Sequence, residues 1–93
     1  MNNYFISNYT KTQAKKLGVV VKKSKIKGKK IDVFKNEKKI ASIGAIGYMD
    51  YPSYIKTKGK KYAEERRKLY KQRHNKDRNV KGSNGYYADK LLW

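Results

Sequence analysis

Positive charge limits what this chain can fold into more than any other feature of its sequence. Its 25 Lys and Arg residues face only 7 Asp and Glu residues, which leaves a formal net charge of +18. Charges of one sign repel each other in a compact state and reduce its stability. We therefore expect a polyanionic partner that relieves this repulsion, and nucleic acid, an acidic protein surface and anionic lipid all qualify.

The material for a hydrophobic core is limited. A chain of 93 residues hides only about 60–65 per cent of its unfolded surface when it folds. Nine Tyr, two Phe and one Trp supply much of the apolar surface, and buried tyrosines need partners for their hydroxyl groups. Because the chain has no cysteine and one histidine, we predict no disulfide, no metal site and no cofactor.

The apolar runs of the chain are too short to cross a membrane. The longest, residues 17–21 and 40–46, are far below the roughly 20 residues of a membrane-spanning helix. The first six residues also lack the basic and apolar regions of a secretory signal. We therefore predict no membrane span and an intracellular or intravirion location.

Three short segments rich in β-branched residues predict a three-stranded antiparallel meander. They cover residues 19–21, 30–34 and 39–43. A three-residue hairpin loop at residues 36–38 would place Ile31 opposite Ile43 and Val33 opposite Ala41, which gathers aliphatic side chains on one face. Glu37 stands where Gly would make such a turn easier. Residues 1–17 show no sustained period and are interpreted as a flexible N-terminal arm, although residues 10–17 have the length for one or two helical turns.

The C-terminal half predicts one main helix over residues 61–74. Its apolar stripe of Tyr62, Ala63, Leu69 and Tyr70 is expected to lie on the sheet. Residues 48–54 are interpreted as an aromatic loop, since Pro52 blocks strand pairing. Residues 86–93 form a short apolar segment that docks on the core or on a partner. The prediction is an α+β fold in which one main helix packs on the meander, with residues 18–93 as a single small basic domain.

Two stretches of the chain resemble a known family. They comprise residues 28–45 (GKKIDVFKNEKKIASIGA) with Gly47-Tyr48 and Asp50-Tyr51, and then Glu65-Arg66-Arg67, Tyr70, Arg73-His74 and Leu91-Leu92-Trp93. The family is an uncharacterised one of small basic proteins encoded by large DNA viruses of algae and amoebae and by some marine phages. Glu37 and Ile43 depart from its usual turn Gly and aromatic residue, and residues 1–27 lie outside the similarity. The resemblance implies a viral source and a virion-associated role, without naming a mechanism.

Two clusters of cations are candidate polyanion-binding sites. Lysine is a mobile point charge suited to phosphate contacts without base geometry, and arginine pairs bidentately with phosphate or carboxylate. The alternatives are a lysine loop that is merely solvated, and arginines that tie Asp50 or Asp89 to the helix. The candidate residues are Lys22, Lys23, Lys25, Lys27, Lys29 and Lys30 in the first cluster, and Arg66, Arg67, Lys71 and Arg73 in the second.

Aromatic residues near the cations are candidates for docking a partner. Three roles are possible for these aromatic side chains: stacking on unpaired bases, filling the core, and burial against another protein. The residues predicted to dock a partner are Tyr48, Tyr51, Tyr54, Leu92 and Trp93. His74 has no nucleophile or base partner in a recognisable pattern, so the sequence predicts no catalytic residue.

Three classes of function follow from these features. The first is a non-enzymatic, virion-associated structural protein, such as a minor capsid or core component, that binds DNA or acidic protein surfaces. The second is a free accessory protein that binds nucleic acid without sequence specificity. The third, a small nuclease, would require a metal or base constellation that the sequence does not contain. The resemblance places the virion component first.

Overall fold

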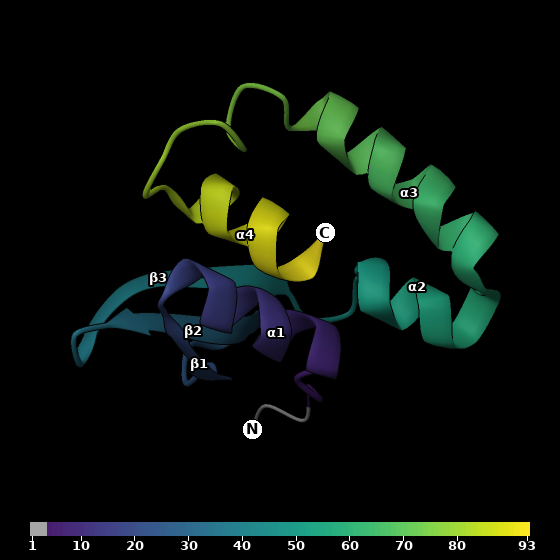
Figure 1. The fold of residues 1–93 in the computed structure, drawn as a ribbon. Helices are drawn as coiled ribbons and strands as arrows, with labels where there is room; N and C mark the ends of the chain where they lie inside the picture. Colours follow the sequence, from purple (N-terminus) through teal and green to yellow (C-terminus); the bar gives the residue numbers. More distant parts are fainter. Residues whose placement is uncertain (1–3) are drawn as a thin grey trace.

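The computed structural model describes residues 4–93, which form one three-stranded antiparallel sheet and four helices (Figure 1). In chain order the elements are α1 (Asn8–Leu17), β1 (Val20–Lys23), β2 (Lys29–Lys35), β3 (Lys38–Ala45), α2 (Tyr51–Lys58), α3 (Lys60–Arg73) and α4 (Asn84–Leu92). The strands are hydrogen-bonded in the order β1-β2-β3, so each connection joins neighbouring strands. The predicted α+β class with a three-stranded antiparallel meander is confirmed.

The central strands pair as their alternating pattern predicted. Ile31 lies opposite Ile43, and Val33 lies opposite Ala41. All four side chains are buried. Because successive residues of a strand point to opposite faces, these side chains gather on one face and form the centre of the core. The predicted register is confirmed.

The turn between β2 and β3 is one residue shorter than predicted. Lys35 pairs with Lys38, so residues 36 and 37 alone form the loop. Asn36 (φ 53°) and Glu37 (φ 66°) are both left-handed, as in a type I′ turn, and Glu37 occupies the position where Gly is favoured. One extra residue on β3, Ile40, then forms a bulge in the ladder. The bulge compensates for the shorter turn and preserves the predicted register.

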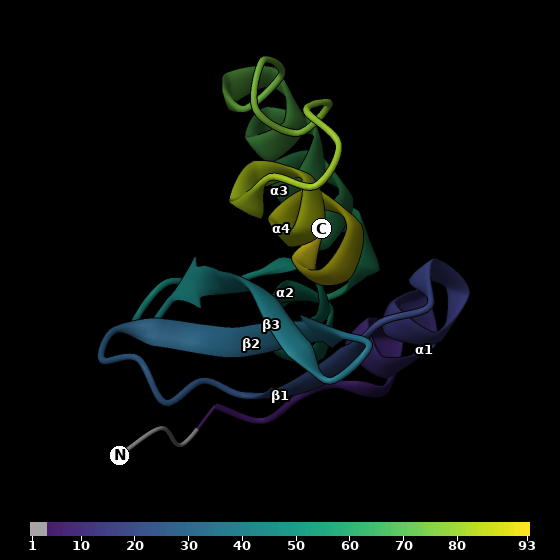
Figure 2. The same ribbon diagram turned by 90° about the vertical axis from the view of Figure 1, so that its left-hand side faces the viewer.

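Helix α4, rather than α3, covers the apolar face of the sheet. Leu91 and Leu92 are buried in the central cluster, and α3 lies beyond α4 in both views (Figures 1 and 2). Within α3 only Ala63 and Tyr70 are buried, while Leu69 is 45% exposed. The prediction that residues 61–74 pack on the sheet is wrong, because the apolar stripe of α3 faces α2 and the rings near α4 instead.

Most of the predicted N-terminal arm is the folded helix α1. Ser7 caps this helix by accepting the backbone N–H of Thr10 (3.2 Å), and Gly18 ends it in the left-handed conformation (φ 71°). Thr10 is buried and donates its hydroxyl to the carbonyl of Leu91 (2.8 Å), and Ala14 belongs to the core. The interpretation of residues 8–17 as a flexible arm is therefore wrong, and the alternative of helical turns over residues 10–17 is the one observed. The part of that arm before residue 4 lies outside the described residues.

The predicted aromatic loop is a loop only in its first part. Asp50 caps α2, since its side chain accepts the backbone N–H of Ser53 (3.1 Å), and Pro52 stands in the first turn, where no helical N–H is needed. Residues 51–54 are thus helical, and the ring of Tyr51 is buried. Tyr48 remains in the loop before the cap. The prediction of a loop over residues 48–54 is wrong from Tyr51 onwards.

Candidate functional site

The connection between β1 and β2, residues 24–28, is anchored at its base by a buried carboxylate. Asp32 accepts the hydroxyls of Ser24 (2.6 Å) and Ser42 (2.7 Å) and the backbone N–H of Lys25 (3.3 Å). Burial alone would raise the pKa of Asp32, but these hydrogen bonds and the charge of Lys39 outweigh it and lower the pKa. The network holds the ends of the loop while its middle extends into solvent.

Lysine side chains in this connection and on the strand ends beside it form a cationic surface. Lys22, Lys23, Lys25 and Lys27 are exposed, and Lys29 is half-buried. Within residues 4–93 no carboxylate lies within ion-pair distance of the first four. We call the five residues the lysine loop. Its members Lys23, Lys25, Lys27 and Lys29 line a cavity of about 910 Å³ together with Ile46.

Lys30 does not belong to this surface. Its side chain is buried (4% exposed), and its Nζ lies 3.1 Å from Asp50 Oδ2 and 5.2 Å from the ring centre of Tyr4. The same carboxylate oxygen accepts the Tyr4 hydroxyl (2.5 Å). Burial, followed by Asp50, raises the pKa of Tyr4. The prediction that Lys30 binds a polyanion is wrong, because a buried cation with a buried carboxylate partner cannot reach a ligand without losing that pair.

Two cations of α3 hold the helices together. Lys71 Nζ lies 2.7 Å from the buried carboxylate of Asp89 on α4. Arg67 pairs with Glu64 (3.1 Å) and lies 4.3 Å from the ring centre of Tyr51 on α2. The Tyr51 hydroxyl donates a hydrogen bond to the Glu64 carboxylate. This bond and the neighbouring Arg67 lower the pKa of Glu64. The same bond, together with burial, raises the pKa of Tyr51. Arg67 and Lys71, predicted as polyanion contacts, therefore have structural partners inside the protein.

Arg66 and Arg73 are arranged differently from their neighbours on α3. Asp50 is paired with Lys30, and Asp89 with Lys71. Among the described residues no carboxylate is within ion-pair distance of either arginine. The alternative that these arginines tie Asp50 or Asp89 to the helix is therefore wrong.

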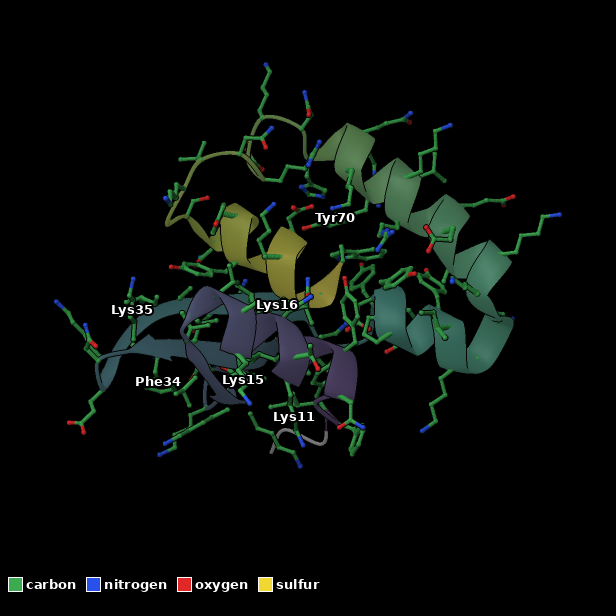
Figure 3. All side chains as sticks on the ribbon, viewed as in Figure 1. Lys11, Lys15, Lys16, Phe34, Lys35 and Tyr70 are labelled. Atoms are coloured by element: carbon green, nitrogen blue, oxygen red, sulfur yellow. The ribbon has the colours of Figure 1, made fainter. Side chains whose placement is uncertain are left out.

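Both arginines line a second cavity, of about 530 Å³, which we call the arginine cavity. It lies where α3, the end of α4 and the strand ends meet, and Lys29 of the lysine loop also lines it. Its aromatic wall is formed by rings from α2, from α3 and from the residue that follows α4. Trp93 stacks on Tyr70 with ring centres 4.3 Å apart and planes 8° apart, and Tyr54 is tilted against Trp93 at 6.2 Å. The position of Tyr70 between α3 and α4 is visible in Figure 3.

The residues predicted to dock a partner separate into two groups. Tyr51 and Leu92 are buried inside the protein itself, so their assignment to a partner surface is wrong. Tyr54 and Trp93 are partly buried in the aromatic wall, and Tyr48 is 76% exposed at the rim of the arginine cavity. Of the two fates predicted for the C-terminal segment, docking on the protein's own core is the one observed for its leucines.

Helix α1 adds cations that the sequence interpretation omitted. Lys11, Lys15 and Lys16 are exposed along α1 (Figure 3). Lys11 and Lys15 are four residues apart and so share a helix face. The signal was present in the Ser7 cap and in the core-facing spacing of Thr10 and Ala14, but a polar Thr obscured the apolar period.

Titratable groups outside these clusters give no sign of a metal centre. Within residues 4–93 no group of three or more His, Asp or Glu side chains could hold a metal ion. His74 stacks on Tyr70, with ring centres 4.4 Å apart, and its Nδ1 lies 3.8 Å from Asp77 Oδ2. Burial, then Asp89 and Asp77, raise the pKa of Tyr70 to about 12.

No helix in the described part of the chain has the length and apolarity to cross a membrane.

Comparison of the chain with protein-family models, with curated proteins and with solved structures finds no match in any of the three.

Proposed function

We propose that this protein is a non-enzymatic binder of nucleic acid that contacts the phosphate backbone without sequence specificity. One observation carries the proposal: Lys29 lines both the lysine-loop cavity and the arginine cavity. Cations from opposite halves of the chain thus line two adjoining cavities. Mobile lysines, which do not fix base geometry, favour backbone contacts over base readout.

A chain of phosphates suits this surface better than a compact acidic protein does. The cations extend from Lys23 and Lys25 on the loop, past Lys29, to Arg66 and Arg73 on α3. A polymer with regularly spaced charges can neutralise such an extended row, whereas a protein surface mixes both signs and apolar atoms. The net charge of +18 also favours fast association with a polyanion.

Salt-dependent binding tests the proposal. If about six to eight phosphates are neutralised, log K for duplex DNA falls against log salt with a slope of about −5 to −7, nearly independent of sequence. Replacing Lys25, Lys27 and Lys29 with Ala is expected to reduce the slope by about three units. Fluorescence anisotropy of labelled DNA over a salt series gives both numbers.

The matched control removes three lysines from the opposite end of the sheet. Lys35, Lys38 and Lys39 flank the β2–β3 turn, and in a meander this turn and the β1–β2 connection lie at opposite ends. Lys35 projects from that end in Figure 3. The control triple variant is expected to change the slope by less than the loop variant. A slope near zero for the unaltered protein, or binding to an acidic protein that persists at salt concentrations where DNA is released, would refute the proposal.

The setting we propose for this activity is a virion, as a minor capsid or core component. It depends on the sequence resemblance to small basic viral proteins, and an intracellular accessory protein is the second candidate, because the same cationic surface would serve it. Mass spectrometry of purified particles distinguishes the two. Stoichiometric presence of the chain in particles supports the virion component, and its recovery only from infected cells supports the accessory protein.

A further inference from the structure

The arginine cavity has a composition that backbone contacts alone do not require. Its lining combines cations with rings: Arg66 and Arg73 from α3, Tyr54 from α2, and Tyr70 and Trp93 beside α4. A volume of about 530 Å³ lies within the range of about 300–1,000 Å³ for sites that bind small molecules. We infer that this cavity binds one unpaired nucleotide of a single-stranded nucleic acid, an inference that rests on the proposed function.

The exposed ring of Tyr48 supplies the surface on which a base can stack. Behind it, Tyr70 is buried between the rings of Trp93 and His74, and Tyr54 borders Trp93 at an angle, so the wall gives the cavity a rigid aromatic support. Tyr48 stands at the rim, 76% exposed, with no ring contact to another aromatic residue of the described chain. Proteins that bind single strands without sequence preference stack bases on such rings, since every base presents a π-face.

The arginines supply the partner for the phosphate. Arg66 and Arg73 are about two helical turns apart and therefore lie on one side of α3, with Tyr70 between them. The guanidinium of Arg66 lies 5.7 Å from the ring centre of Tyr54, so a cation and a ring are adjacent in the wall. Asp50 is the one acidic residue in the described lining, and it is buried and paired with Lys30. The charge presented to a ligand is therefore positive.

The shape of the cavity selects an unpaired nucleotide. A base inside a duplex is covered on both faces by its neighbours and reaches a recessed pocket only if it leaves the stack, which costs a few kcal/mol. A nucleotide in a single strand pays less of this cost. Because Lys29 connects the cavity to the lysine loop, the flanking phosphates of a strand have cations to contact. A free nucleotide has none of these flanking phosphates, which favours a strand as the source.

The test compares two labelled DNAs that carry the same number of phosphates, an oligo-dT strand and a hairpin duplex. Binding of the full chain is followed by anisotropy and by the fluorescence of Trp93, the one Trp of the sequence. We expect the strand to bind about tenfold tighter than the hairpin and to quench Trp93. The double variant Arg66→Gln with Arg73→Gln is expected to lose about tenfold in affinity for the strand and less for the hairpin.

Two matched controls distinguish binding at the cavity from nonspecific electrostatic attraction and from nonspecific contact with exposed aromatic rings. Lys68→Gln with Lys76→Gln likewise removes two cations, both of them exposed, but leaves the lining of this cavity unchanged. Tyr48→Ala removes the rim ring and is expected to weaken strand binding about tenfold. Phe5→Ala removes a ring of similar exposure, 72%, that does not line this cavity, and is expected to leave strand affinity unchanged. Circular dichroism confirms that each variant is folded.

Three outcomes would overturn the inference, and they have different consequences. If the strand and the hairpin bind with equal affinity, and the arginine and lysine double variants lose affinity equally, backbone binding would stand but the nucleotide site would be refuted. Binding of dTMP as tight as that of oligo-dT would assign the cavity to a free nucleotide. Absence of binding by either DNA at low salt would overturn the proposed function itself.

Discussion

Replacing Leu92 with Ala tests which helix covers the sheet. Leu92 is 1% exposed in the central cluster. Its Cδ1 lies so close to the strand backbone that a Cβ placed on Gly44 would be only 2.9 Å away. Truncating a buried Leu costs about 2–5 kcal/mol, and the cost is highest where the surroundings cannot collapse into the cavity. Because one wall here is hydrogen-bonded sheet, we expect a loss of about 3–4 kcal/mol.

This loss is large for a domain of this size. A chain of 93 residues is expected to have a free energy of unfolding of about 5–14 kcal/mol. Because each kcal/mol corresponds to about 4–8 °C in a domain this small, the Tm is expected to fall by about 12–32 °C. Urea unfolding followed by far-UV circular dichroism gives the free energy directly, and a thermal melt checks the Tm.

The matched control is the same substitution at Leu69. Its side chain on α3 is 45% exposed, so Leu69→Ala is expected to cost no more than about 0.5–1 kcal/mol. Equal losses in the two variants, or a larger loss at Leu69, would refute the packing of α4 on the sheet. Such a result would instead place α3 against the strands.

Two further substitutions probe the backbone and the buried carboxylate. Gly44→Ala is expected to cost about 1–3 kcal/mol in the urea assay, because φ is +78° and the new Cβ would lie 2.8 Å from the Lys30 side chain. Gly28→Ala, at φ +84° with no atom within 4 Å of the new Cβ, isolates the conformational cost. Equal losses of stability in the two variants would exclude a steric contribution at Gly44. Asp32→Asn removes a carboxylate whose pKa is lowered below the ordinary 3.8, so the unaltered protein holds this stabilisation above about pH 4 and loses it as pH falls through the lowered pKa. The difference in unfolding free energy between Asp32→Asn and the unaltered protein is therefore expected to shrink below pH 4, and a difference independent of pH would contradict the role of the ionised carboxylate.

The strands were predictable because their determinants are local. Alternation of apolar and polar residues shows which side chains share a face, and this placed Ile31 opposite Ile43. The turn was predicted one residue too long, yet the register held because the bulge at Ile40 compensates. Register is strongly specified where one face is buried, since a slip of one residue would expose every core side chain.

The helices were harder to assign because their partners lie far away in the sequence. A helical stripe shows that a face is apolar, but not what the face contacts. The stripe of α3 was assigned to the sheet, whereas its Tyr70 stacks on Trp93. Helix α1 was predicted only as one or two turns over residues 10–17, because Thr10, a polar residue, occupies a buried position where its hydroxyl bonds to the Leu91 carbonyl. Neither contact leaves a periodic signal in the sequence.

The sequence by itself determined the cationic character, the α+β class, the meander and the exposure of most of the lysine loop. Only the tertiary structure decided which cations are available to a ligand. Lys30 and Lys71 are held by Asp50 and Asp89, which lie 20 and 18 positions away along the chain. An ion pair depends on the distance between two side chains and on their burial, and neither quantity can be obtained from residue types alone. With these carboxylates already paired inside the protein, Arg66 is presented to the arginine cavity.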